Sequence, residues 1–236
     1  ENPLLIQFIG NNPKEFKECV QNIKNCSFVD LNAGCPSPDQ CKNNSGSSLL
    51  KDLKNLKKII KTMVKYSPVP VSVKIRMGWD KDESVKIGKL VEKSGASFIT
   101  VHPRTRFQTY RTPADWNVIK KVKNSVKIPV VANGDLLNAK DVKRCGEITG
   151  CNSFMIARGA INNPFIFNDT KHYLKTGELI KHSKKDRIDL ILRFIKLYNK
   201  YDKEFYNISE LRNHCSWMLK GFRGARKMRG IIGKCK

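Results

Sequence analysis

The stretch that decides the fold is residues 29–40, VDLNAGCPSPDQ, in which an apolar strand ends in a turn that holds a cysteine. The run from Phe28 to Leu31 is short, apolar and β-branched or aromatic, as a buried strand is. Gly34 and Pro36 then break the pattern on either side of Cys35. The sequence therefore predicts a thiol at the C-terminal end of a strand, the edge where α/β barrels carry their chemistry. A cysteine that merely fills space as a small apolar residue is the plainer alternative.

Five other apolar runs resemble this strand, and polar, helix-like segments separate them. The predicted strands are residues 4–8, 28–32, 71–76, 98–102, 129–133 and 154–157. The predicted helices are residues 13–23, 48–65, 83–93, 113–122 and 139–145. Strands that alternate with helices predict a parallel sheet with right-handed crossovers. Six strands are two fewer than a closed α/β barrel requires, so an open six-stranded sheet is the competing architecture.

Polar residues at the strand ends favour the barrel. They are Gln7, Asn32, Lys74, His102 and Asn133, each at or near the C-terminal end of a different predicted strand. Polar groups at one end of apolar strands are costly in a core unless they bind something. We therefore expect an incomplete TIM-type barrel with its site on one rim.

After about residue 170 the pattern becomes purely helical. Apolar stripes run along residues 186–201 and 209–219. The first stripe comprises Ile188, Ile191, Leu192, Ile195 and Tyr198, and the second comprises Leu211, Cys215, Met218 and Leu219. We expect a catalytic barrel over residues 1–169 and a small helical domain over residues 170–236.

The chain is strongly basic, with 45 Lys and Arg against 21 Asp and Glu and a formal charge of +24. Such an excess favours a polyanionic partner, nucleic acid before membrane. Its last stretch carries basic residues beside aromatic ones, a combination that suits RNA. These residues are Trp217, Lys220, Phe222, Arg223, Arg226, Lys227, Arg229, Lys234 and Lys236. Compositional drift and a solvated tail are the alternatives.

Eight cysteines occur without a CxxC pair, so no zinc pattern is present. No leader-like segment or apolar run of membrane length is found either. These features predict a cytoplasmic protein, or an organellar one if a targeting segment before Glu1 has been removed.

Two loops resemble the phosphate cradles of barrels. Residues 131–135, VANGD, and residues 155–159, MIARG, each end a predicted strand with a residue that lets backbone approach a ligand closely. A lone Asn-Gly pair is only a turn signal, whereas two such loops in consecutive units are more specific.

Five ordered motifs then carry a family resemblance. They are LNAGCPSP at residues 31–38, VSVKIRMGWD at 71–80, VHPRT at 101–105, VANGD at 131–135 and MIARGA at 155–160. Together they resemble the tRNA-dihydrouridine synthases, flavoenzymes with an FMN-binding barrel and a C-terminal helical domain. The resemblance runs from about Leu4 to about Lys220, and two βα units that the family has before Leu4 are absent.

The resemblance implies an oxidoreductase that reduces specific uridines of tRNA to 5,6-dihydrouridine, with FMN as cofactor and NADPH as electron donor. Cys35 is then the catalytic acid that delivers a proton to C5, opposite the hydride added at C6. Gln7 and Lys74 would bind the isoalloxazine, and His102 would pack near it. The remaining expected cofactor contacts, to phosphate and ribityl, are Asn133, Gly134, Asp135, Ala157 and Arg158. For Lys74 an interior salt bridge, and for His102 a buried core histidine, are the structural alternatives.

The target uridine must leave its stack to reach the flavin. The expected substrate and tRNA contacts are Asn32, Lys42, Arg104, Arg106 and Arg111, with the helical domain on the tRNA elbow. We expect tRNA and NAD(P)H as partners, no membrane, no metal, and a monomer. Two other functions stay open: an FMN barrel acting on a free pyrimidine, as dihydroorotate dehydrogenases do, and an RNA-binding remnant without catalysis.

Overall fold

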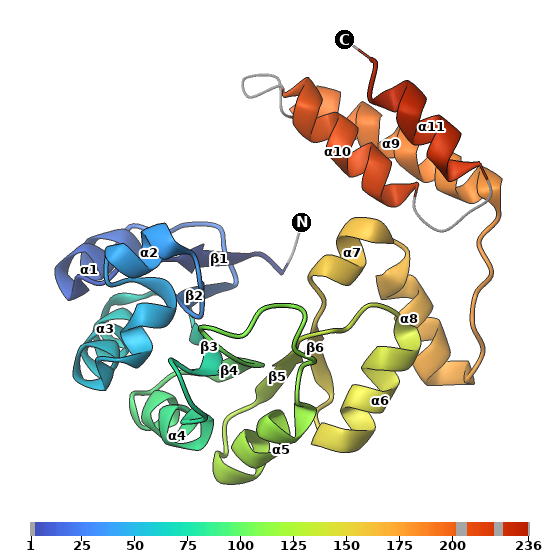
Figure 1. The fold of residues 1–236 in the computed structure, drawn as a ribbon. Helices are drawn as coiled ribbons and strands as arrows, with labels where there is room; N and C mark the ends of the chain where they lie inside the picture. The colour runs from blue at the N-terminus through green and yellow to red at the C-terminus, as the bar shows by residue number, and fades with distance from the viewer. Residues whose placement is uncertain (1–2, 202–206, 220–223, 236) are drawn as a thin grey trace. The chain divides into compact units, whose positions relative to one another are not determined.

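The computed structural model describes residues 3–201, 207–219 and 224–235 (Figure 1). The chain divides into two compact units, one of residues 1–135 and 144–155 and the other of residues 136–143 and 156–236. Within the described ranges, no helix is both long and apolar enough to cross a membrane. Four residues of the basic C-terminal stretch, Lys220, Phe222, Arg223 and Lys236, lie outside those ranges.

The first unit contains a six-stranded parallel sheet whose strands follow one another in sequence order. The strands are β1 (Leu5–Phe8), β2 (Phe28–Ala33), β3 (Val71–Gly78), β4 (Phe98–Thr105), β5 (Val130–Asn133) and β6 (Ser153–Met155). Because crossovers between parallel neighbours are right-handed, this unbroken order places every connecting helix on one face of the sheet. A doubly wound sheet reverses its order and carries helices on both faces. The structure therefore confirms an incomplete TIM-type barrel rather than an open doubly wound sheet.

Helices α1 (Pro13–Gln21), α3 (Leu53–Tyr66), α4 (Ser84–Lys93), α5 (Trp116–Ser125) and α6 (Ala139–Thr149) connect the strands. Figure 1 shows α3, α4 and α5 following the outer side of the sheet. Asn12, Asp52 and Asp115 precede α1, α3 and α5, and each side chain accepts a backbone N–H of the first turn. Between β2 and α3 the chain also forms α2 (Pro38–Lys42) and the 3₁₀ helix η1 (Gly46–Leu50).

The outward face of the sheet forms the core of the first unit. Leu31 of β2, Val73 of β3 and Val101 of β4 are apolar and fully buried. Ile59 of α3 and Ile119 of α5 are fully buried as well. Each such side chain stabilises the fold by roughly 1.5–3 kcal/mol through burial. This layer holds the strands in fixed register and leaves the opposite face free for polar residues.

The inward face of the sheet is polar, and the register arranges its residues in rows. From the middle of the strands toward their C-terminal ends, the rows are Gln7 with Asp30 and Ser72, Asn32 with Lys74 and Thr100, and Arg76 with His102. Every second residue of a strand lies on the same face, so these rows share one surface. The C-terminal edge of this surface is the rim on which the site is built.

The second unit contains α7 (Arg158–Asn162), α8 (Ile166–Thr176), α9 (Lys184–Tyr201), α10 (Ile208–Met218) and α11 (Ala225–Ile232). Its apolar cluster comprises Ile191, Leu211, Cys215, Met218 and Leu219, with Phe194, Ile195, Tyr198, Ile208, Met228 and Ile232 packed against it. The apolar stripe predicted for α10 is confirmed. On α9 the prediction for Leu192 is wrong, because this residue lies about 100° around the helix from Ile191 and is 58% exposed.

All six predicted strands are present, with different ends. β3 continues to Gly78 and β4 to Thr105, beyond the predicted ends at residues 76 and 102. Helices α2, α7, α8 and α11 were not predicted. Helix α7 packs against α10, so the compact units divide near residue 155, whereas the sequence suggests a boundary between residues 169 and 170.

Candidate active site

The turn that carries Cys35 is held by the side chain of Asn32. The Oδ1 atom of Asn32 accepts the backbone N–H of Gly34 at 3.1 Å and that of Cys35 at 2.8 Å. The carbonyl of Cys35 in turn accepts the N–H of Ser47 at 2.9 Å. Cys35 is half-buried. Its backbone is thus fixed on both sides, which limits the positions available to the thiol.

Gly46 lets the following loop pack directly against Cys35. It has a φ of +60°, and a Cβ atom at this position would lie 2.8 Å from the carbonyl oxygen of Cys35 and 3.0 Å from its Cβ. Only glycine combines this conformation with such a close approach without strain. The loop that begins η1 therefore forms one wall of the cysteine turn.

Arg76 fixes the turn from the neighbouring strand. Its Nε donates to the carbonyl of Gly34 at 3.0 Å, and its Nη1 donates to the carbonyls of Thr105 at 2.6 Å and Gln108 at 3.2 Å. The side chain is only 4% exposed. Arg76 thus joins the end of β2 to the loop after β4. The alternation in the sequence predicts the face of the strand on which Arg76 lies, but it does not predict these contacts.

Lys74 places a positive charge beside the thiol. Its side chain is half-buried, and its Nζ makes no hydrogen bond or ion pair with the described residues. Burial lowers the pKa of Lys74, and the nearby carboxylate of Asp30 partly opposes this shift. The charge of Lys74 also interacts with Cys35. An ammonium without a partner inside a barrel is available to an anionic ligand.

A buried carboxyl group, Asp30, organises the row below Lys74 and was not predicted as part of the site. It is 1% exposed and accepts from Gln7 Nε2 at 2.7 Å and from Ser72 Oγ at 2.6 Å. Burial raises the pKa of Asp30, while these hydrogen bonds and Lys74 oppose the shift. The Oε1 atom of Gln7 accepts from Asn32 Nδ2 at 2.9 Å. Gln7, expected to contact a cofactor, thus links Asp30 to the residue that holds the cysteine turn.

His102 is neutral and has a defined tautomer. It is 8% exposed, and burial together with the charges of Lys74, Arg76 and Arg104 lowers its pKa to about 3. Its Nε2 lies 3.0 Å from Nη1 of Arg104. Arginine can only donate, so Nε2 accepts and the proton resides on Nδ1. The Nδ1–H group has no hydrogen-bond partner among the described residues, which makes it a donor available to a ligand.

Arg104 lies within the protein, although the sequence predicts that it contacts RNA. It is 0% exposed, and its guanidinium donates to the carbonyl of Thr112 at 2.7 Å and to Asp135 Oδ2 at 2.5 Å, besides His102. The difference arises because β4 continues to Thr105 and carries Arg104 into the structure. Here Arg104 orients His102 instead of facing solvent.

The loop after β5 is also tied to its surroundings. Asn133 Nδ2 donates to the carbonyl of Met155 at 2.7 Å, and Trp116 Nε1 donates to the carbonyl of Gly134 at 2.9 Å. Asp135 accepts the N–H of Ala114 at 2.8 Å in addition to its pair with Arg104.

The other predicted phosphate loop begins the second unit. Ala157 is the N-cap residue of α7, and Arg158 is the first residue of that helix. Both residues belong to the second compact unit.

Three of the predicted RNA contacts lie at or near the surface of the first unit. Lys42 at the end of α2 and Arg111 in the loop after β4 are exposed. Arg106 is half-buried, and its Nε donates to Sγ of Cys41 at 3.3 Å. This contact, together with hydrogen bonds from Ser47 and Ser48, lowers the pKa of Cys41 although burial opposes the shift. The fifth predicted contact, Asn32, uses its side chain to hold the cysteine turn and to bind Gln7.

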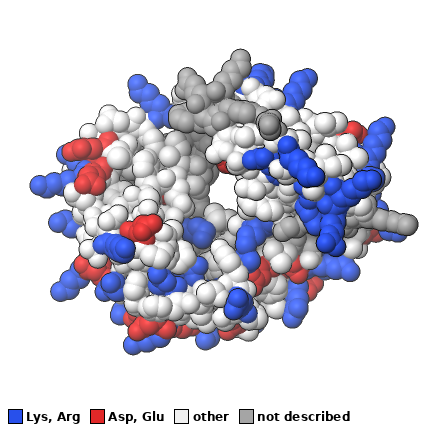
Figure 2. All heavy atoms as spheres, turned by 45° about the horizontal axis from the view of Figure 1, so that its top comes forward, with Lys and Arg blue, Asp and Glu red and all other residues white. Residues whose placement is uncertain are grey.

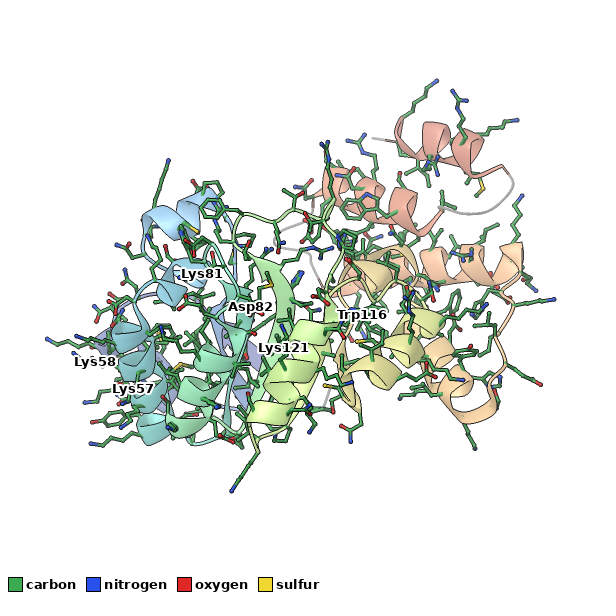
Figure 3. The ribbon with its side chains drawn as sticks, turned by 60° about the horizontal axis from the view of Figure 1, so that its bottom comes forward. Lys57, Lys58, Lys81, Asp82, Trp116 and Lys121 are labelled. Atoms are coloured by element: carbon green, nitrogen blue, oxygen red, sulfur yellow. The ribbon has the colours of Figure 1, made fainter. Side chains whose placement is uncertain are left out.

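Positive charge is not confined to the rim. Figure 2 shows Lys and Arg side chains over much of the visible surface, with smaller groups of acidic side chains between them. Lys57 and Lys58 project from α3, whereas Lys121 of α5 pairs with Asp82 at 3.9 Å (Figure 3). Among the described residues, no group of three or more His, Cys, Asp or Glu side chains could hold a metal ion.

Two curated proteins are similar to this chain over most of its length. A Rickettsia bellii protein named "Probable tRNA-dihydrouridine synthase" is 35% identical over 232 residues, which cover 96% of this chain and 71% of that protein. The "tRNA-dihydrouridine synthase B" of Pseudomonas aeruginosa is 34% identical over 240 residues, covering 99% and 72%.

A solved structure and a family model complete the comparison. The crystal structure of N-acetylneuraminate lyase from Mycoplasma synoviae is similar to this structure with a TM-score of 0.50 and 12% sequence identity. The match covers 72% of this chain and 59% of the lyase chain, and it shows a likeness of fold alone. The model of the family described as "Dihydrouridine synthase (Dus)" matches residues 1–236. The chain therefore belongs to the dihydrouridine synthase family.

Proposed function

We propose that this chain reduces specific uridines of tRNA to 5,6-dihydrouridine, with FMN as cofactor and NADPH as electron donor. Membership of the family and the names of the relatives support the reaction and the tRNA substrate. The single observation that carries the proposal is that the charge of Lys74, which makes no hydrogen bond or ion pair with the described residues, interacts with Cys35 on its fixed turn. A thiol and a desolvated cation at the C-terminal edge of a barrel suit a reaction that needs both a proton and a stabilised anion.

The groups available on the inner face fit a flavin. A reduced isoalloxazine is anionic, and Lys74 offers a positive charge that the nearby Asp30 attracts but that forms no hydrogen bond or ion pair with the described residues. His102 offers a neutral Nδ1–H donor. Bound FMN supplies the hydride that adds to C6 of the uracil. Lys74 and His102 would orient the ring system so that one face is presented to the RNA base.

Cys35 is the acid in this proposal. Its thiol gives a proton to C5 of the uracil, on the face opposite the hydride. Asn32 accepts two backbone N–H groups of the turn, Arg76 donates to a carbonyl of the turn, and Gly46 packs against it, so the backbone that carries the thiol is held in place. Such positioning lowers the activation barrier more than acid strength alone does, because a misplaced donor would have to move into place before proton transfer.

The remaining predicted contacts complete the binding site. We assign the phosphate and ribityl groups to the loop after β5, through Asn133, Gly134 and Asp135. For Ala157 and Arg158, contact with these groups stays a prediction from the family resemblance. Gln7 would support the ring from below through its links to Asp30 and Asn32. On the RNA side we retain Asn32, Lys42, Arg106 and Arg111, and assign Arg104 to positioning His102.

Two readouts on the purified full chain test this function. The protein is expected to be yellow, with absorbance near about 450 nm that bleaches on addition of NADPH. Incubation with unmodified tRNA and NADPH is expected to give dihydrouridine, measured by mass spectrometry of the digested nucleosides.

The outcomes separate the competing functions. A yellow protein that reduces a free pyrimidine but leaves tRNA unchanged would contradict the proposal and favour the second kind of FMN barrel. A colourless protein that binds tRNA, and forms no dihydrouridine when FMN is supplied, would favour the non-catalytic remnant.

A further inference from the structure

Aromatic and basic side chains, two of them exposed and two half-buried, form a cluster on the rim of the first unit. The rings of Trp79 and Phe107 meet edge to face, with centroids 5.5 Å apart and planes at 76°. The guanidinium of Arg106 lies 5.5 Å from the ring of Phe107 and 5.8 Å from that of Trp79. The ammonium of Lys51 lies 4.6 Å from the ring of Trp79. We call these four residues the rim cluster.

The rim cluster offers both a flat apolar surface and unused hydrogen-bond donors. Phe107 is 60% exposed, although its ring packs against that of Trp79. An exposed aromatic ring that a neighbour holds in place is a stronger indication of a binding surface than a freely moving ring, because its orientation is already set. Arg106 uses Nε on Cys41, and its Nη atoms make no hydrogen bond with the described residues. A fixed cation therefore lies directly beside an exposed ring.

The same loops that hold Cys35 also carry this cluster. Trp79 follows β3, Arg106 and Phe107 follow β4, and Lys51 follows η1, which packs on the cysteine turn. The N–H of Arg106 donates to the carbonyls of Gly78 at 3.2 Å and Trp79 at 2.9 Å, which ties two of these loops together. The cluster thus lies on the C-terminal edge of the barrel, as the candidate active site does.

We propose that the rim cluster is a stacking subsite for a second unpaired nucleotide of the RNA, distinct from the uridine that is reduced. The base stacks on the exposed face of Phe107, and Arg106 and Lys51 contact its phosphate. This inference rests on the proposed function, since it assumes that RNA reaches this rim. An aromatic face flanked by cations is the arrangement by which proteins bind single-stranded nucleic acid with little dependence on sequence.

The choice of RNA over an acidic protein rests on the chemistry of Phe107. Lys51 and Arg106 would attract either partner, but an exposed ring held against Trp79 adds specific affinity only to a flat group such as a base. The test must therefore separate ring stacking from charge.

Three substitutions and a matched control make that separation, all in the full chain and with transcribed tRNA. Phe107→Leu keeps apolar bulk without a π face, and Phe107→Trp restores the face. Tyr66→Leu is the control, because Tyr66 is also flanked by two cations, Lys17 at 4.8 Å and Lys65 at 5.1 Å, but ends α3 at the opposite edge of the sheet. Lys51→Gln removes charge alone. The Kd for tRNA is measured at several salt concentrations.

Phe107→Leu is expected to raise the Kd by roughly 5- to 100-fold, with an unchanged slope of log Kd against log salt concentration. Phe107→Trp and Tyr66→Leu are expected to keep the Kd within about twofold of the wild-type value, because they leave a stacking face in place at the rim. Lys51→Gln is expected to reduce the salt slope by about 0.7 to 0.9.

Wild-type affinity in Phe107→Leu, or equal weakening in Phe107→Trp, would overturn the subsite while leaving the proposed function intact. A wild-type protein that binds no tRNA and forms no dihydrouridine would overturn the proposed function, and the subsite with it.

Discussion

At the scale of single residues, the site depends on side chains whose protonation is set by their neighbours. His102 is buried and lies near three positive charges, which together lower its pKa to about 3. The folded protein therefore keeps the imidazole neutral down to that pH. Arg104 reinforces this state by donating to Nε2, which requires a lone pair on that atom. A neutral imidazole can donate from Nδ1 without adding another positive charge beside Lys74.

The lowered pKa of His102 predicts a loss of stability in acid. The unfolded chain binds a proton at His102 near pH 6.5, whereas the folded chain does so only near pH 3, so stability is complete above pH 6.5 and falls as the pH decreases toward 3. The slope from this residue is about 1.4 kcal/mol per pH unit within that window. His102→Asn keeps an acceptor for Arg104 and is expected to flatten the fall in the free energy of unfolding between pH 6.5 and 5, measured with urea. An identical fall in the wild type and the variant would contradict the assignment.

Gly46 supports a second prediction at this scale. Gly46→Ala forces an L residue into a φ of +60° and places a Cβ against Cys35, so it is expected to destabilise the fold and displace the thiol. Gly150→Ala is the matched control, since Gly150 has a φ of +70° with nothing within 4 Å of the added Cβ. We expect about 1 kcal/mol of destabilisation in the control and roughly 1–2 kcal/mol more in Gly46→Ala.

Urea unfolding and dihydrouridine formation measure the two effects of Gly46→Ala. Its activity is expected to fall further than the folded fraction explains, whereas Gly150→Ala keeps its activity. Equal stability and equal activity in the two variants would show that the contact with Cys35 is unimportant.

At the scale of elements, the cysteine turn is a joint between strands. Arg76 of β3 donates to Gly34 after β2 and to Thr105 at the end of β4, so one guanidinium fixes three consecutive strands at their C-terminal ends. The rows of polar residues below it depend on the same register, which the apolar outward face maintains. The geometry of the rim therefore depends on the register of several strands and not on one loop alone.

Removal of the Arg76 guanidinium tests this joint. Arg76→Met leaves three carbonyl groups without their donor and is expected to reduce the free energy of unfolding by about 3 kcal/mol. Arg76→Lys keeps the charge but loses the forked geometry, so an intermediate loss is expected. Arg111→Met, an exposed arginine in the loop after β4, serves as the control and should change stability by less than about 0.5 kcal/mol. A loss no larger than that of the control would show that Arg76 does not hold the turn.

The sequence predicted elements better than contacts, for physical reasons. Strand and helix signals are local, so the strands and the apolar stripe of α10 could be recognised from spacing alone. The glycine and proline residues around Cys35 similarly marked its turn. Asp30 and Arg76 were missed because their partners are set by strand register, and Arg104 was placed at the surface because the end of β4 was set too early.

At the scale of the whole molecule, the properties that bear on RNA binding and on domain organisation are the net charge and the division into two compact units. The chain has 45 basic against 21 acidic residues, and basic side chains lie over much of the face shown in Figure 2. The C-terminal helices α9, α10 and α11 have an apolar cluster of their own, as the stripes on two of them indicated. The boundary was harder to predict because the packing of α7 on α10 leaves no signal in local sequence.

The charge predicts a steep dependence of tRNA binding on salt. Each phosphate neutralised contributes about 0.7 to 0.9 to the slope of log Kd against log salt concentration, so several contacts should weaken binding more than tenfold between about 50 and 200 mM salt. Binding isotherms of the full chain with transcribed tRNA would measure this. A flat response would favour compositional drift over an RNA-binding surface.

The central claim is that Cys35 gives a proton to the uracil while the flavin supplies the hydride, and one variant separates these steps. In Cys35→Ala, NADPH should still bleach the flavin absorbance, whereas dihydrouridine formation in tRNA should fall by at least about 100-fold, the usual contribution of a positioned acid. Cys19→Ala, which removes an exposed cysteine of α1, should match the wild type in both measurements. Dihydrouridine formation at the wild-type rate in Cys35→Ala, or an equal loss of flavin reduction, would contradict the account.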